Sequence, residues 1–196
     1  MKLLVVSCGI GKPSSTRWLA DRLAEATESA LREECALEVR VAEIRELAMD
    51  LAHHLVTGVA SPMVRDVIAN VAAADGLIAA TPIFAASYSG LFKSFFDVLD
   101  DAALAGKPVL IAASGGTWRH ALALEHAIRP LFVQLRALTV PTAVYAVRDP
   151  DDGSAVELTA RIFRAAHELA ALMRARHSFP LVTADPGCLA AKQATG

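Results

Sequence analysis

TPIFAASYSGLFK, residues 81–93, is the stretch that decides the fold. It follows the apolar run 76–80, which is short and bounded by turn residues and is therefore typical of a buried strand. It leads into a second apolar run with helical spacing, which starts at Tyr88 or Ser89. A proline, hydroxyl side chains and a glycine lie between strand and helix, so this loop suits backbone that faces a ligand.

Outward from this stretch, the same reasoning predicts four more strands, at about 3–6, 37–42, 107–113 and 140–147. Helical periods lie between them, in the ranges 14–31, 62–75, 118–136 and 155–176. Segment 44–61 has no clear period, and we expect a long loop there with one helical turn around 47–51.

Strands that alternate with helices predict an α/β fold, because right-handed crossovers bring the strands parallel in one open sheet. We expect five parallel strands in the flavodoxin-like order 2-1-3-4-5, with helices on both faces. The chain of 196 residues fits one domain, 1–177, followed by a C-terminal tail, 178–196, that has two prolines and no period.

Composition and charge exclude several classes of partner. A net charge of -2 without a cluster of basic residues predicts no nucleic acid and no membrane partner. The first apolar run is too short for a signal peptide or a membrane span. Cys8, Cys35 and Cys188 show no metal-ligand spacing, and the pair His53-His54 has no further ligands nearby. We therefore expect a cytoplasmic protein without a metal.

Three unusual loops, those after the first, third and fourth strands, meet at the sheet edge where such folds bind ligands. The first joins Gly9 and Gly11 to the hydroxyls of Ser14, Ser15 and Thr16 at a helix start, which favours a phosphomonoester site. The alternative is that these hydroxyls only cap the helix. A dinucleotide-binding GxGxxG motif is excluded because Ser14 stands in place of its third glycine. A Walker loop is excluded because Pro13 stands in place of its required Ser or Thr.

The second loop offers the rings of Phe84 and Tyr88 and the hydroxyls of Ser87 and Ser89, a combination that suits a flat heteroaromatic ring. The alternative is that Ser87 or Ser89 caps the next helix. In the third loop, Gly115 and Gly116 lack Cβ atoms, so backbone can approach a ligand edge closely, although an ordinary turn has the same composition.

The helix after the third strand is apolar nearly all round, from Leu91 to Leu99. A helix on the outside of a sheet needs one apolar stripe, so the second apolar face predicts burial against another subunit, or under a covering loop.

Ser14-x-Thr16-x-x-Leu19-Ala20, the stretch 81–93 and Ser114-Gly115-Gly116 together resemble the NAD(P)H-dependent FMN reductase family. The likeness is closest to the reductases that supply reduced flavin to sulfonate monooxygenases, and it covers about residues 2–147. The first loop departs from the family, because 8–13 replaces a Gly-Ser-Pro-Arg-like start.

The resemblance implies FMN as cofactor, NADPH or NADH as reductant, a monooxygenase as possible partner and a homodimer or homotetramer. Segment 122–130 looks like the tetramer-forming helix of the subgroup, with His126 at a position often occupied by Tyr. The residues implied for FMN are Ser14, Ser15, Thr16 and Arg17 at the phosphate, Pro82, Ile83, Phe84 and the loop hydroxyl of Ser87 near the ring, and Ser114, Gly115 and Gly116 at the pyrimidine edge.

The expected reaction is hydride transfer from a nicotinamide to FMN, in which the flavin carries the chemistry and no catalytic side chain is needed. An FMN-containing quinone, azo or metal-ion reductase and a flavodoxin-like electron carrier are the alternatives. A phospho-receiver domain is excluded, because Ser7-Cys8-Gly9 and Thr81-Pro82 stand where its acidic residues would be. Arg119 or Arg17 is a candidate for binding the 2′-phosphate of NADPH.

Overall fold

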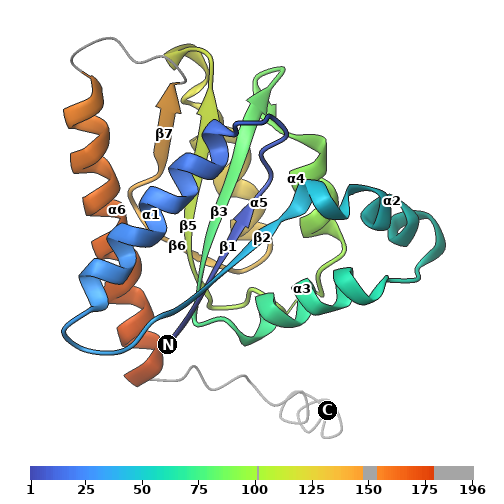
Figure 1. The fold of residues 1–196 in the computed structure, drawn as a ribbon, viewed down its shortest axis with the longest axis horizontal. Coiled ribbons are helices and arrows are strands. Elements are labelled where there is room, and N and C mark those ends of the chain that lie inside the picture. The colour runs from blue at the N-terminus through green and yellow to red at the C-terminus, as the bar shows by residue number, and fades with distance from the viewer. Residues whose placement is uncertain (101, 148–153, 179–196) are drawn as a thin grey trace, which may run out of the picture.

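The computed structural model describes residues 1–100, 102–147 and 154–178. A parallel sheet forms its centre, in the spatial order β2, β1, β3, β5 and then β6 and β7, which both pair with β5 (Figure 1). The strands are β1 Lys2–Ser7, β2 Glu38–Glu43, β3 Gly76–Phe84, β5 Pro108–Gly115, β6 Leu138–Thr139 and β7 Val144–Val147. The predicted order 2-1-3-4-5 is thus confirmed, with the fifth strand in two pieces.

Helices cover both faces of this sheet (Figure 1). On one face lie α1 Ser15–Leu31 and α6 Ser154–Ser178; the other carries α2 Ala48–Thr57, α3 Pro62–Ala73, α4 Gly90–Asp97 and α5 Arg129–Gln134. Residues of β1 alternate between the two cores: Leu3 and Val5 pack on the α1 side, and Leu4 and Val6 on the other. Both faces of the strand are buried, as its continuous apolar sequence predicts.

The expectation of a long loop at 44–61 is wrong, although the helical turn expected around 47–51 is present. A 3₁₀-helix, Ile44–Leu47, runs into α2 there. Ile44, Leu47 and Leu51 are buried on one narrow stripe, while Met49 and Val56 are apolar but exposed. These exposed apolar side chains hide the helical period in the sequence.

The helix predicted at 118–136 is interrupted. A 3₁₀ turn, Trp118–His120, and a π-helical turn, Leu124–Ile128, precede α5. Pro130 has no N–H and its ring crowds the preceding turn, so a regular α-helical ladder cannot pass through it. The amide of Arg129 instead donates to the carbonyl oxygen of Leu124, which gives the wider turn.

The apolar faces of α4 are filled within the subunit. Phe92, Phe95 and Phe96 are all buried. The ring of Phe96 lies 4.9 Å from that of Phe132, measured between centroids. Most of the apolar surface that suggested a subunit contact is therefore covered within the chain, while Leu91 and Val98 are only partly buried, and the contact itself stays a prediction.

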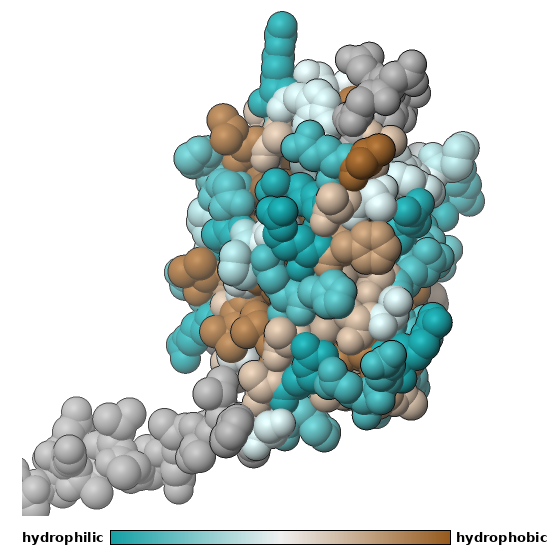
Figure 2. All heavy atoms as spheres, turned by 90° about the vertical axis from the view of Figure 1, so that its left-hand side faces the viewer, coloured by the Kyte–Doolittle hydropathy of each residue, from teal (hydrophilic) through white to brown (hydrophobic). Residues whose placement is uncertain are grey.

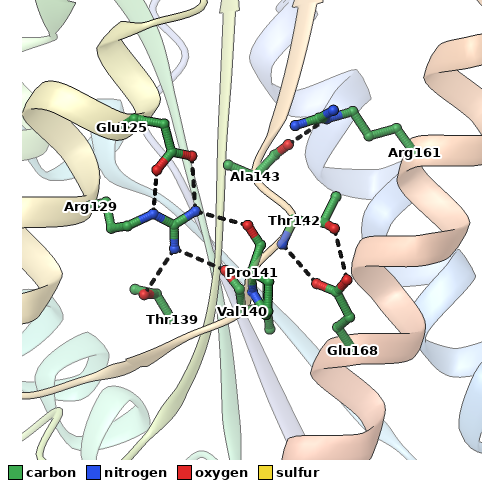
Figure 3. A network of polar contacts seen from close by, with 9 residues as sticks. All are labelled: Glu125, Arg129, Thr139, Val140, Pro141, Thr142, Ala143, Arg161 and Glu168. Carbon is green, nitrogen blue, oxygen red and sulfur yellow. Dashed lines mark hydrogen bonds and ion pairs between the residues drawn. The ribbon is translucent and has the colours of Figure 1, made fainter.

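Charged side chains hold the segment between β6 and β7, where Pro141 cannot donate to a neighbouring strand (Figure 3). Arg129 donates to the carbonyl oxygens of Val140 and Pro141, and Arg161 donates to that of Ala143. Glu168 accepts from the amide and the hydroxyl of Thr142 at 2.8 and 2.7 Å. These bonds satisfy backbone groups that lie off the sheet ladder, and they fix the start of β7.

The outer surface beside α6 is mixed in character. Figure 2 shows apolar side chains scattered among hydrophilic ones there, without one continuous apolar patch. Within residues 1–100, 102–147 and 154–178, no single helix has the length and apolar character to cross a membrane, although the segments Ile44–Thr57 and Pro62–Ala73, bent by 91°, pass that test as a pair. The same residues contain no cluster of His, Cys, Asp and Glu that could hold a metal ion.

One expectation falls on residues that the structure does not describe. The tail expected at 178–196 lies outside the described residues, apart from Ser178, which ends α6.

Candidate functional site

A pocket of about 340 Å³ lies at the carboxyl ends of β1, β3 and β5. It is lined by Ile10, Gly11, Pro13, Ser14, Ser15, Thr16, Pro82, Ile83, Phe84, Ser114, Gly115 and Gly116. The three loops predicted to meet do meet here, at the point where strand order reverses.

The first wall of the pocket is the N-terminus of α1. Ser14 is its N-cap, and its hydroxyl accepts from the amide of Arg17 at 3.1 Å. The amides of Ser15 and Thr16 donate to no other group of the described residues. Free N–H donors and the positive end of the helix dipole therefore face this end of the pocket, a combination that binds anions.

Gly9 makes room for that cap. A Cβ atom at Gly9 would lie 2.0 Å from the hydroxyl oxygen of Ser14 and 3.2 Å from the Cβ of Thr16. Any larger residue would therefore displace the capping side chain. The sequence suggests that Gly9 permits tight backbone, and the structure shows that it also leaves room for the hydroxyl of Ser14.

Ser114, at the end of β5, ties the first loop to the third. The hydroxyl oxygens of Thr16 and Ser114 are 2.7 Å apart, and both side chains are buried. Ser15 adds a longer bond of 3.3 Å to the same oxygen. The helix N-terminus and the strand end are thus held in one fixed arrangement.

The second wall is a hairpin that extends the sheet. β3 continues through Pro82 and Ile83 to Phe84, and the short strand β4, Ser87–Tyr88, pairs with it antiparallel. The side chain of Phe84 is 50% exposed. Ala85 and Ala86 form the turn with φ values of 47° and 64°. Left-handed backbone is costly for alanine, so this turn holds strain beside the pocket.

The hydroxyl of Ser89 caps α4, as one alternative for this loop predicts. It accepts from the amide of Phe92 at 3.2 Å. Thr81, which is fully buried, accepts from the amide of Ser89 at 3.1 Å. These bonds fix the passage from the hairpin into the helix and leave the face of Phe84 to the pocket.

The two glycines of the third loop have different surroundings. A Cβ atom at Gly116 would meet no atom within 4 Å, whereas one at Gly115 would lie 2.1 Å from the hydroxyl oxygen of Tyr145. Gly116 therefore leaves open space on the pocket side, and Gly115 leaves room for a side chain of β7.

All the residues implied for FMN line this pocket except Arg17 and Ser87. The guanidinium of Arg17 pairs with Asp21 and Glu43, each at 2.7 Å, and these hydrogen bonds raise the pKa of Arg17. Ser87 pairs with Phe84 in the hairpin instead. Ile10, Gly11 and Pro13 also line the pocket, although they were not among the residues implied for FMN; their place in the first loop was a usable signal.

Cys8 stands at the end of β1 but does not line the pocket. It is fully buried, and burial raises the pKa of its thiol far above its ordinary value, with a smaller contribution from the nearby carboxylate of Glu43. A neutral buried thiol is a poor nucleophile, so this cysteine acts as a packed side chain.

The lining of the pocket fits a phosphorylated flavin. Every lining residue named for this pocket is uncharged, so a phosphate there would be met by hydroxyls, free amides and the helix dipole. Pro82, Ile83 and Phe84 offer an apolar wall for a flat ring, and the backbone of Gly116 is open for its polar edge. No acid–base pair is needed when the ligand carries the redox chemistry.

Comparison with known proteins finds one matching family and, among the relatives, two FMN reductases. The family model described as NADPH-dependent FMN reductase matches residues 1–151. The chain is 38% identical to an FMN reductase (NADPH) of Pseudomonas aeruginosa over 178 residues, covering 89% of this chain and 94% of the relative. It is 36% identical to the NADH-dependent FMN reductase SfnE of Pseudomonas putida over 181 residues, covering 91% and 95%.

Solved structures agree with this relationship. An oxidoreductase from Corynebacterium diphtheriae superposes with a TM-score of 0.86 at 44% identity, covering 89% of this chain and 97% of the other. A flavodoxin from the domain Archaea, at 15% identity, covers 89% and 99% with a TM-score of 0.62, which shows the flavodoxin-like fold alone. From the family match and the relatives that share nearly its whole length, the chain belongs to the NADPH-dependent FMN reductase family.

Proposed function

We propose that this protein is an NAD(P)H-dependent FMN reductase. The observation that carries the proposal is the pocket in which a helix N-terminus with free amides and hydroxyls, an apolar hairpin and an open glycine backbone converge at one sheet edge. The family match and the names of the relatives, which use NADPH or NADH with FMN, support the same activity.

In this proposal, each part of the pocket binds one part of FMN. Ser14, Ser15 and Thr16 bind the phosphate with their hydroxyls and free amides. Pro82, Ile83 and Phe84 line the ring and the ribityl chain, and Ser114, Gly115 and Gly116 meet the pyrimidine edge. Arg17 is left out because its guanidinium is paired with Asp21 and Glu43. Ser87 is left out because it lies in the hairpin, paired with Phe84, and does not line the pocket.

Bound FMN would supply the chemistry by accepting a hydride from the dihydronicotinamide at flavin N5. The protein's own residues bind FMN, orient it and shield it. The bond between Thr16 and Ser114 holds the phosphate end and the ring-edge end of the pocket at a fixed separation. The half-exposed Phe84 at the hairpin leaves the ring accessible to a second nucleotide.

We further propose that the reduced flavin serves a monooxygenase in the cytoplasm, as the relative's name SfnE and the resemblance to sulfonate-linked reductases suggest. A homodimer or homotetramer is the expected assembly. Exposed apolar side chains on α2, on the connection to α3 and at the start of α3 support such an assembly: Met49, Leu55, Val56, Val59 and Met63. Light scattering of the purified protein measures the number of subunits.

The test is to purify the protein and follow oxidation of NADPH and NADH with and without added FMN. Oxidation that requires FMN and saturates with it supports the proposal. No flavin binding and no oxidation refutes it. Oxidation only when a quinone or an azo dye is added indicates a reductase with bound FMN, and a flavin that accepts electrons only from another protein indicates a carrier.

A further inference from the structure

Tyr145 lies directly behind the glycine loop of the pocket. It belongs to β7, opposite Ala113 of β5, and its side chain is 4% exposed. Its hydroxyl donates to the carbonyl oxygen of Thr117 at 2.9 Å. The side chain therefore runs along the sheet from β7 to the segment that follows β5.

The hydroxyl of Tyr145 also occupies the space that a side chain at residue 115 would need. A Cβ atom at Gly115 would lie 2.1 Å from this oxygen, 3.1 Å from the ring carbon that bears it and 3.7 Å from the next ring carbon. Gly115 and Tyr145 are thus a matched pair, in which the glycine is required by the tyrosine.

The segment that Tyr145 contacts has few other supports. The amides of Gly116 and Thr117 donate to no other group of the described residues. Thr117 accepts at its carbonyl oxygen from Tyr145 and, at 3.3 Å, from the amide of His120. A segment with open backbone amides keeps one position only if something else holds it.

Tyr145 itself is held firmly. β7 pairs with β5 from Val144 to Val147. Arg161 and Glu168 fix the residues just before it, Ala143 and Thr142 (Figure 3). The ring of Tyr145 also lies 5.7 Å from that of Trp118, measured between centroids. A rigid strand therefore carries the hydroxyl that holds the loop.

We propose that Tyr145 is a positioning residue for the Gly115–Thr117 segment, so that FMN affinity depends on the hydroxyl of Tyr145 although this side chain does not line the FMN pocket. This inference rests on the proposed function, because it takes Gly115 and Gly116 to meet the pyrimidine edge of FMN. Loss of the hydroxyl leaves the carbonyl oxygen of Thr117 with only the longer bond from the amide of His120, and FMN binding must then order the loop.

The first test compares Tyr145→Phe with wild type. We expect the Kd for FMN, measured by quenching of flavin fluorescence, to rise about three- to tenfold, as for loss of one hydrogen bond. Hydrogen exchange of the Arg119 and His120 amides, which donate to the hydroxyl and the carbonyl oxygen of Thr117, should become about three- to tenfold faster without flavin. The KM for NADPH or NADH should not change. Thr159→Val, which removes a hydroxyl of α6 that donates to the carbonyl oxygen of Ala155, is the control and should leave both FMN affinity and loop exchange unchanged.

The second test is a double-mutant cycle. Gly115→Ala in wild type should raise the Kd for FMN by about thirtyfold or more, because its Cβ clashes with the hydroxyl of Tyr145. In the Tyr145→Phe background, the same substitution should cost no more than about threefold further, because the nearest remaining atom is 3.1 Å away.

Three outcomes overturn the inference. Tyr145→Phe could leave both loop exchange and FMN affinity unchanged, or the two substitutions could have independent, multiplying effects. Wild-type protein that binds no FMN would refute the proposed function and this inference together. Wild-type binding with insensitive variants would refute the positioning role alone.

Discussion

If the turn at Ala85 and Ala86 is strained, replacing these alanines with glycine should raise stability, whereas the same change in an ordinary helix lowers it. We expect the double variant Ala85→Gly/Ala86→Gly to be more stable than wild type. Left-handed backbone costs a residue with a Cβ about 1–2 kcal/mol, and the φ values here are 47° and 64°. Glycine removes this cost but increases the entropy of the unfolded chain by about 0.5–1 kcal/mol per site. The net gain is about 1–2 kcal/mol for the pair.

Calorimetry and urea denaturation measure this gain. For a chain of 196 residues, we expect the Tm to rise by about 2–8 °C. Ala160→Gly, the same chemical change at an exposed position of α6, is the control and should lower stability by about 1 kcal/mol. A double variant that is as stable as wild type or less stable would refute the claim that this turn is strained.

The same variant should bind FMN less tightly, by about threefold, because a glycine turn holds Phe84 less rigidly beside the pocket. Strain kept at a binding site at a cost in stability is expected when it fixes a functional side chain. An unchanged or improved Kd would show that the turn does not contribute to the site.

Three more predictions concern other parts of the chain. Gly9→Ala should cost about 1 kcal/mol of stability in urea denaturation by displacing the cap Ser14, and Gly9→Ala/Ser14→Gly should be no less stable than Ser14→Gly alone; additive losses would contradict this. Lys107→Met should lower the free energy of unfolding by about 3 kcal/mol, because the buried ammonium donates to the carbonyl oxygens of Val71, Ala72 and Ala74. A loss under about 1 kcal/mol would show that these bonds contribute little. Burial raises the pKa of the Cys8 thiol, so as pH rises the thiol ionises in the unfolded chain before it does in the folded protein. Above about pH 9, the free energy of unfolding of wild type should therefore fall by about 1.4 kcal/mol per pH unit more than that of Cys8→Ala. Equal pH dependence in the two proteins would contradict the raised pKa.

The strands and the three ligand loops could be predicted from sequence because their signals are local. Short apolar runs bounded by turn residues identify β1, β3 and β5, and the hydroxyls before α1 identify its cap. Strand order followed from general rules of parallel sheets, and the meeting of the loops followed from that order.

The remaining features depend on partners distant in the chain. From sequence, Gly115 is interpreted as leaving room for a ligand, because no nearby residue indicates that Tyr145 fills the space beside it. Arg17 resembles a phosphate ligand until Glu43, 26 residues away, is found on its guanidinium. The apolar sequence of α4 does not reveal that Phe92 and Phe96 pack against Phe132, about 40 residues further along the chain.

The relative affinity of the protein for FMN and riboflavin tests the central claim most directly, because the two flavins differ only in the phosphate. If the α1 N-terminus binds that phosphate, FMN should bind at least about thirtyfold more tightly than riboflavin, and Ser15→Ala should reduce this ratio by about threefold or more while leaving riboflavin affinity unchanged. Equal affinities for the two flavins would contradict the account.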